Sequence, residues 1–110
     1  MTENVLQSNC YIWLHNNYPD LRGLLCYNLS NSKNRVDGAK NKALGLQAGS
    51  SDMVFYYKSK AYMIEMKTKI GKQSKVQKNW QDTVKAQGFE YVIIKSLEEF
   101  QNYIKSVIEL

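Results

Sequence analysis

Three charged side chains in the middle of the chain have the types and the spacing that metal-dependent hydrolysis of phosphate esters requires. Asp52 precedes a short apolar run, and Glu65 and Lys67 end the next one. Side chains alternate along a strand, so Glu65 and Lys67 point to the same face of a sheet. A tight hairpin between the two runs brings the start of the first run beside the end of the second. We therefore expect Asp52, Glu65 and Lys67 to share one site.

Such a site is suited to a divalent cation. Two neighbouring carboxylates repel each other unless a cation lies between them, and carboxylate oxygens are ligands for Mg²⁺ or Mn²⁺. The backbone carbonyl of Met66 is a third oxygen ligand in this prediction. A bound ion lowers the pKa of a water molecule, and Lys67 would orient that water and stabilise negative charge on a phosphate. The residues predict a phosphodiester hydrolase.

Hydrophobic patterning predicts that these residues belong to an α/β fold with the element order α-β-(α)-β-β-α-β-α. We expect a single domain over residues 1–110. The pattern predicts helices over 2–17, over 35–44, from Ser74 to Gly88 and from Ser96 onward, and strands over 24–27, 53–57, 61–66 and 91–94, with a loop over 28–34. The strand at 91–94 is expected to be buried on both faces and parallel to an earlier strand. Val76, Trp80 and Val84 are expected to face the core.

The joint pattern resembles a known nuclease family. Gly49-Ser50-Ser51-Asp52, then Glu65-Met66-Lys67, then Gln77 on the following helix, is similar to the PD-(D/E)xK superfamily and more narrowly to its VRR-NUC group. That group occurs as stand-alone proteins in bacteriophages and as a domain of larger repair nucleases. The resemblance covers residues 45–97, and Ser51 stands where the family usually has proline.

The resemblance implies a restriction-endonuclease-like core, a central mixed β-sheet flanked by helices, and a role for each matching residue. Asp52 and Glu65 would be metal ligands, Lys67 the catalytic lysine, and Gln77 the helix residue that completes the site. An acidic residue on the first helix often joins such sites, and Glu3 is the matching candidate. The implied activity is Mg²⁺-dependent endonucleolytic cleavage of DNA, in branched or otherwise structured substrates.

Each of these residues also has a purely structural interpretation. Asp52 would serve as a turn residue, and Glu65 with Lys67 as an exposed cross-strand pair. Gln77 forms a capping box with Ser74, and Glu3 is favoured at a helix N-terminus by electrostatics alone.

The charge distribution favours a polyanionic partner. The chain has a net charge of +5, and residues 33–85 hold twelve of its 15 Lys and Arg but only four acidic residues. Such an excess around carboxylates favours nucleic acid, although a solvated basic surface is the alternative. The candidate phosphate contacts are Lys69, Lys72, Lys75 and Lys78, and Asn28 and Ser30 are further candidates for substrate contact.

The remaining expectations concern location and assembly. No apolar run has the roughly 20 residues of a membrane span, and we expect a cytoplasmic protein of a bacterium or a phage-infected host. Cys10 and Cys26 are expected to be buried free thiols. Stand-alone members of the family resemble Holliday-junction resolvases, which implies a homodimer. Two alternatives remain open: a non-catalytic nucleic-acid-binding module with a nuclease-like fold, and a small interaction protein.

Overall fold

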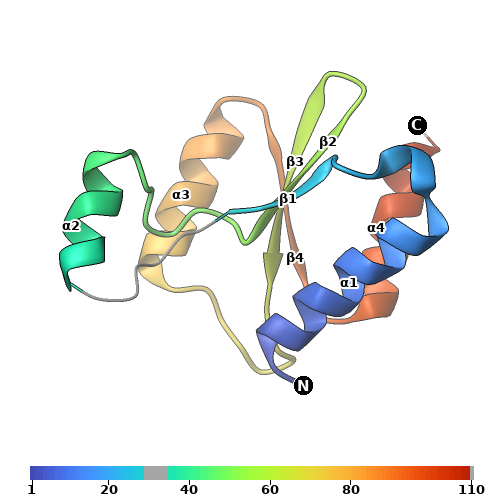
Figure 1. Ribbon diagram of the computed structural model, residues 1–110, viewed down its shortest axis with the longest axis horizontal. Helices are drawn as coiled ribbons and strands as arrows, with labels where there is room; N and C mark the ends of the chain where they lie inside the picture. The colour runs from blue at the N-terminus through green and yellow to red at the C-terminus, as the bar shows by residue number, and fades with distance from the viewer. Residues whose placement is uncertain (29–34, 110) are drawn as a thin grey trace.

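The computed structural model describes residues 1–28 and 35–109, and it has a mixed β-sheet between helices (Figure 1). The elements are α1 (Glu3–Asn17), a 3₁₀ turn (Pro19–Leu21), β1 (Leu25–Tyr27), α2 (Arg35–Ala43), β2 (Met53–Tyr57), β3 (Lys60–Met66), α3 (Lys75–Ala86), β4 (Glu90–Ile94) and α4 (Leu97–Ile108). The α/β class expected from the sequence is confirmed. The expectations for Ser30 and for most of the 28–34 loop fall outside the described residues.

The central hairpin forms because its turn suits the strands that it joins. Lys58 and Ser59 have positive φ angles of 47° and 67°, which is the backbone of a two-residue hairpin turn whose twist matches the strands. β2 and β3 then pair antiparallel, with Met53 opposite Ile64 and Tyr57 opposite Lys60. This register places the residue before β2 beside the C-terminal end of β3.

The described strands lie in the order β1-β2-β3-β4. β1 pairs antiparallel with β2, and β4 pairs parallel with β3 after the chain has crossed over through α3. The expected parallel pairing is thus confirmed. Of the β4 residues only Ile94 is buried, so the prediction of burial on both faces is wrong. β4 is an edge strand, and an edge strand has a neighbour on one side only.

The two faces of the sheet are covered unequally. Figure 1 shows α1 and α4 together on one side of the sheet and α3 on the other. Odd-numbered β2 residues and even-numbered β3 residues point toward α1 and α4, as alternation requires. The main core consists of Leu6, Cys10, Leu14, Leu25, Met53, Phe55, Tyr62, Ile64, Met66, Ile94, Phe100, Ile104 and Val107. The opposite face is free to carry polar side chains.

Helix α3 is less buried than its pattern predicts. None of its residues is fully buried: Val76 is 49% exposed, and Trp80 and Val84 are only half-buried. The helix contacts the edge strand β4, and in Figure 1 α2 stands away from it rather than covering its outer side. These three apolar positions at helical spacing are therefore only partly covered.

Two further expectations concern the cysteines and membrane spans. Cys10 is a buried free thiol as predicted, but Cys26 is exposed, because β1 is the other edge strand and its outer face has no covering helix among the described residues. Within residues 1–28 and 35–109, no helix combines the length and the hydropathy that crossing a bilayer requires.

Candidate active site

Strand alternation places the three predicted residues on the face of the sheet that α3 covers. Glu65 belongs to β3 with an orientation opposite to its core-facing neighbours Ile64 and Met66, and Lys67 follows two positions later. Lys67 Nζ lies 3.6 Å from Glu65 Oε2, and both side chains are buried. The interpretation of Glu65 and Lys67 as a solvent-exposed pair is therefore wrong.

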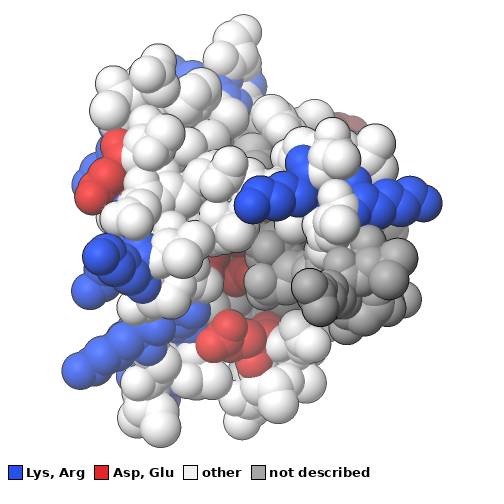
Figure 2. All heavy atoms as spheres, turned by 90° about the vertical axis from the view of Figure 1, so that its left-hand side faces the viewer, with Lys and Arg blue, Asp and Glu red and all other residues white. Residues whose placement is uncertain are grey.

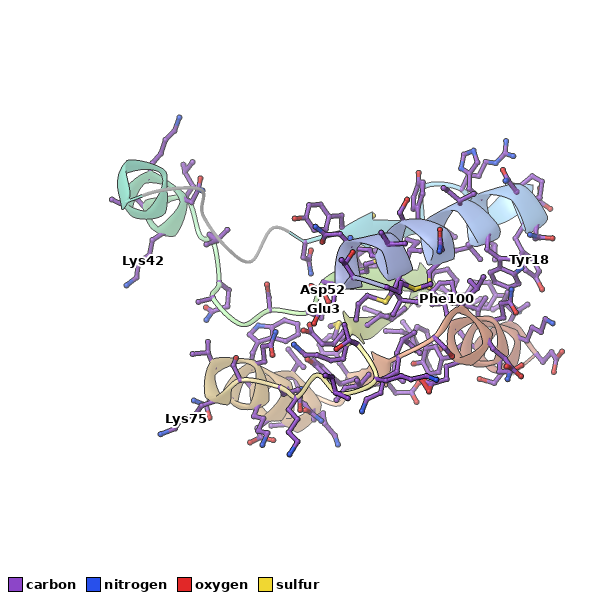
Figure 3. All side chains as sticks on the ribbon, turned by 90° about the horizontal axis from the view of Figure 1, so that it is seen from below. Glu3, Tyr18, Lys42, Asp52, Lys75 and Phe100 are labelled. Carbon is purple, nitrogen blue, oxygen red and sulfur yellow. The ribbon has the colours of Figure 1, made fainter. Side chains whose placement is uncertain are left out.

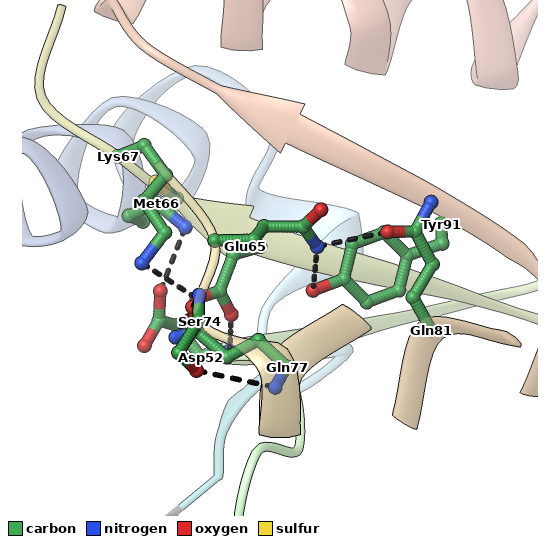
Figure 4. A network of polar contacts seen from close by, with 9 residues as sticks. Asp52, Glu65, Met66, Lys67, Ser74, Gln77, Gln81 and Tyr91 are labelled. Atoms are coloured by element: carbon green, nitrogen blue, oxygen red, sulfur yellow. Dashed lines mark hydrogen bonds and ion pairs between the residues drawn. The ribbon is translucent and has the colours of Figure 1, made fainter. Parts of the chain in front are cut away.

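Asp52 joins the pair through two hydrogen bonds across the hairpin. The Asp52 N–H donates to Glu65 Oε1 at 3.2 Å, and Asp52 Oδ2 accepts from the Met66 N–H at 2.7 Å (Figure 4). The backbone of each strand thus orients the carboxylate of the other. The sequence-based expectation that Asp52, Glu65 and Lys67 come together is confirmed as geometry.

Gln77 reaches the site from the first turn of α3 and has two contacts at once. Its Oε1 accepts from the Ser74 N–H at 2.9 Å, while the Gln77 N–H donates to Ser74 Oγ at 3.2 Å, which completes a capping box. Its Nε2 donates to Glu65 Oε2 at 2.7 Å. The cap fixes the amide plane, so the amide nitrogen is aimed at the carboxylate. The structural and functional interpretations of Gln77 are therefore compatible.

Burial and mutual repulsion raise the pKa values of both carboxyl groups. The pKa of Glu65 rises to about 7, chiefly because burial disfavours the charged form and secondly because Asp52 lies beside it; Lys67 opposes this rise. The pKa of Asp52 is also raised by burial, although the hydrogen bond from Met66 counteracts the effect. A neighbouring positive charge would therefore stabilise the ionised forms of Asp52 and Glu65.

The loop before β2 holds Asp52 in position through a close contact with α3. Gly49 has a φ of +82°, and a Cβ there would lie 2.5 Å from the Val76 carbonyl oxygen. Only glycine permits this approach. Ser51 is fully buried and its Oγ donates to the Met53 carbonyl at 3.0 Å. Serine thus occupies the family's usual proline position with its hydroxyl satisfied.

A second polar group, which the sequence did not predict, lies behind Glu65. Gln73 Nε2 donates to Gln81 Oε1 at 2.8 Å and to the Tyr91 hydroxyl at 3.2 Å. Burial, followed by the charge of Glu65, raises the pKa of Tyr91 and keeps it neutral. No short motif marks these residues, because they come from a loop, a helix and a strand that only the fold brings together.

The remaining predicted residues surround this centre. Glu3, at the start of α1, lies near Asp52 in Figure 3, and its charge contributes to the raised pKa of Asp52. Asn28 donates its N–H to the Asp52 carbonyl at 2.8 Å. On the face shown in Figure 2, acidic atoms lie near the centre with lysine or arginine side chains to both sides. The four predicted phosphate contacts, Lys69, Lys72, Lys75 and Lys78, are all exposed.

The donor set fits one hard divalent cation. Asp52 Oδ1 accepts no hydrogen bond from the residues that the structure describes, whereas the other three carboxylate oxygens of Asp52 and Glu65 do. Carboxylate oxygens are ligands that Mg²⁺ and Mn²⁺ take. Within the described ranges, no group of three or more His, Cys, Asp or Glu side chains converges. Since Mg²⁺ retains several waters, two carboxylates suffice.

The comparisons with known proteins agree with this fold. No protein-family profile matches the chain, and no curated protein is similar to it in sequence. A solved structure described as "VRR_NUC domain protein" superposes with a TM-score of 0.82 at 20% sequence identity, over 100% of this chain and 90% of that one. The resemblance inferred from Asp52, Glu65, Lys67 and Gln77 is thereby supported by an independent comparison of backbones. The chain has the fold of a VRR-NUC domain protein.

Proposed function

We propose that this protein is a divalent-metal-dependent endonuclease that hydrolyses phosphodiester bonds in branched or otherwise structured DNA. The observation that carries the proposal is the convergence of Asp52, Glu65, Lys67 and Gln77 at one point of the sheet. The structural similarity to a VRR-NUC domain protein supports it at the level of the fold.

Each residue has a distinct part in this proposal. Asp52 and Glu65 would hold Mg²⁺ or Mn²⁺, with the Met66 carbonyl as an additional ligand. Glu3 does not converge with these two carboxylates in the described part of the chain, so it would act on the ion at longer range through its charge. The ion would polarise the scissile phosphate and acidify a bound water. Lys67 would position the attacking water and stabilise charge developing on the phosphate. Gln77 would keep the Glu65 carboxylate oriented through its 2.7 Å hydrogen bond.

The surroundings supply the means to bind a phosphate backbone. Lys69, Lys72, Lys75 and Lys78 lie on the loop after β3 and on the first turns of α3, next to Gln77. Basic side chains at this place would contact successive phosphates and release counterions. A four-way junction presents two equivalent strands, so a homodimer with two sites is the assembly that we propose.

The test is cleavage of a four-way junction and of its linear duplex arms with Mg²⁺, with Mn²⁺ and with EDTA. We expect strand scission with either ion and none with EDTA. Lys67→Met keeps the aliphatic stem and removes the ammonium, so it should strongly reduce the cleavage rate while DNA binding is retained. Lys60→Met removes an exposed ammonium at the other end of β3, outside the proposed phosphate contacts, and is the matched control. Metal-independent binding without scission by the unmodified protein would instead assign a non-catalytic DNA-binding module.

A further inference from the structure

A hollow of about 470 Å³ lies on the α1 face of the sheet, opposite the face to which Glu65 and Lys67 point, and it reaches β2 at Met53. Its residues are Asn4, Gln7, Ser8 and Tyr11 of α1, Tyr27 of β1 and Met53 of β2. We call it the tyrosine groove. Met53 follows Asp52 directly in the chain, so the groove begins one residue from a proposed metal ligand.

The α1 side of the groove is a regular stripe. Positions 4, 7, 8 and 11 recur at the spacing of one helix face, and they present two amides, a hydroxyl and an aromatic ring. Tyr11 stacks on His15 with the ring centroids 5.9 Å apart. The helix thus presents hydrogen-bonding groups beside an aromatic ring.

The opposite wall is an exposed tyrosine on an edge strand. Tyr27 pairs with Met53 in the β1–β2 ladder, points to the α1 side of the sheet and is 64% exposed. It makes no ring contact with any residue of the described ranges. A large aromatic side chain with a free face, at the end of the sheet where Asp52 also lies, is suited to stacking on a planar ligand.

Charge distinguishes this hollow from its neighbour. Among the described residues that line it, the tyrosine groove has no Lys, Arg, Asp or Glu, although the protein carries a net charge of +5. A second hollow, of about 400 Å³, lies between the first turn of α1 and the loop after β3, and its lining includes Lys69 and Lys95 together with apolar side chains such as Leu6. Its two ammonium groups can pair with phosphates. The uncharged groove fits a group that offers a ring face and neutral hydrogen-bonding edges.

We propose that the tyrosine groove binds one unpaired base of the DNA strand, next to the scissile phosphate. Bases within a duplex have both faces covered by their neighbours, so only an unpaired base can present a face to a tyrosine ring. The amides of Asn4 and Gln7 are the groups that pair with base edges. This inference rests on the proposed nuclease function and adds to it the source of the preference for branched DNA.

The test uses 2-aminopurine, a fluorescent base, placed at the unpaired position beside the cut in a branched DNA. Fluorescence is measured in EDTA, where no cleavage is expected, and cleavage rates on branched and duplex DNA are compared in Mg²⁺. Tyr27→Ala should remove the quenching of the probe and lower the branched-to-duplex ratio about tenfold. Tyr27→Phe keeps the ring and should retain both. Tyr56→Ala, which alters another exposed tyrosine outside the groove, is the control.

The outcomes separate the two proposals. Cleavage by the unmodified protein, with quenching and preference unchanged in Tyr27→Ala, would overturn the groove and leave the nuclease intact. Quenching that depends on Tyr27, in a protein that cuts no DNA, would support the groove and overturn the nuclease. Sedimentation of Tyr27→Ala as monomer where the unmodified protein is a dimer would assign the groove to subunit contact and also overturn the proposal.

Discussion

The amide nitrogen of Gln77 lies 2.7 Å from Glu65 Oε2 while its amide oxygen caps its own helix by accepting from the Ser74 N–H. One side chain thus links the start of α3 to a carboxylate at the end of β3. Because the cap determines which end of the amide faces the carboxylate, helix stability and carboxylate orientation depend on the same group.

Gln77→Glu should separate the capping of α3 from the orientation of the Glu65 carboxylate. A carboxylate can still cap α3, but it would place a negative charge against Glu65 and raise its pKa further. We expect some loss of stability in thermal unfolding, because Glu65 loses its hydrogen-bond donor, and a higher Mg²⁺ concentration for half-maximal cleavage. Ser74→Ala is the comparison: it should cost about 1 kcal/mol of stability and leave the Mg²⁺ requirement close to that of the unmodified protein. Equal Mg²⁺ curves for Gln77→Glu and the unmodified protein would contradict a link to Glu65.

Lys67→Met should reduce the cleavage rate by a factor of about 10² to 10⁴, the range typical for loss of a group that moves protons or stabilises charge in the transition state. Single-turnover cleavage at saturating protein measures this rate without a contribution from binding. Lys60→Met should stay within a few-fold of normal, because that ammonium is exposed and outside the carboxylate cluster. A similar rate for Lys67→Met and Lys60→Met would remove Lys67 from the chemistry.

Glu65 should give the protein opposite pH dependences of stability and activity. Its pKa is about 7 in the folded chain against 4.5 for the free side chain, so between these values the folded state binds more protons. The free energy of unfolding without metal should therefore fall as pH rises through this window, by an amount on the order of 3 kcal/mol. Urea unfolding in EDTA across this range measures the slope, and Glu65→Gln should flatten it.

Cleavage should rise over the same interval, since a metal ion binds the ionised carboxylate. The midpoint of the rate profile should move to lower pH as Mg²⁺ is increased, because the ion competes with the proton. A midpoint near 7 that does not respond to the Mg²⁺ concentration would indicate a different titrating group.

Gly49→Ala should be strongly destabilising. The added methyl group would meet the Val76 carbonyl at 2.5 Å on a backbone with φ of +82°, so the Asp52 loop or α3 has to move. We expect a loss of roughly 2–4 kcal/mol in chemical unfolding, together with weaker Mg²⁺-dependent cleavage. Gly45→Ala, at a φ of +99° with open space around it, should cost only about 1–2 kcal/mol. Equal losses for the two variants would show that the contact with α3 is unimportant.

Replacing the exposed lysines of the β3–α3 region should lower the salt dependence of DNA binding. Each of Lys69, Lys72, Lys75 and Lys78 that contacts a phosphate should reduce the slope of log K against log salt by about 1 when changed to alanine. Fluorescence anisotropy over a salt series measures the slope. Lys105→Ala, on α4 at the opposite side of the sheet, should leave it unchanged. An unaltered slope in all four variants would place the phosphate backbone elsewhere.

The amino-acid sequence by itself determined the central hairpin and the meeting of its functional groups. Apolar runs at strand spacing on either side of Lys58-Ser59 admit essentially one register, because a slip by one residue would turn the core side chains outward. The positions of Asp52, Glu65 and Lys67 on one face follow from alternation alone. Helix α4 was predictable for a similar reason, since Phe100, Ile104 and Val107 repeat at helical spacing and are buried.

The tertiary structure alone decided how much each element is covered and what lies beside it. Val76 has the helical spacing of a core residue yet is 49% exposed, because coverage depends on elements far away in the chain. Three further features have the same origin. They are the raised pKa of Glu65, the hydrogen bond from Gln77 to Glu65, and the position of Tyr27 across the groove from the α1 side chains. Each depends on distances between segments that are not neighbours in sequence, and local patterning contains no information on those distances.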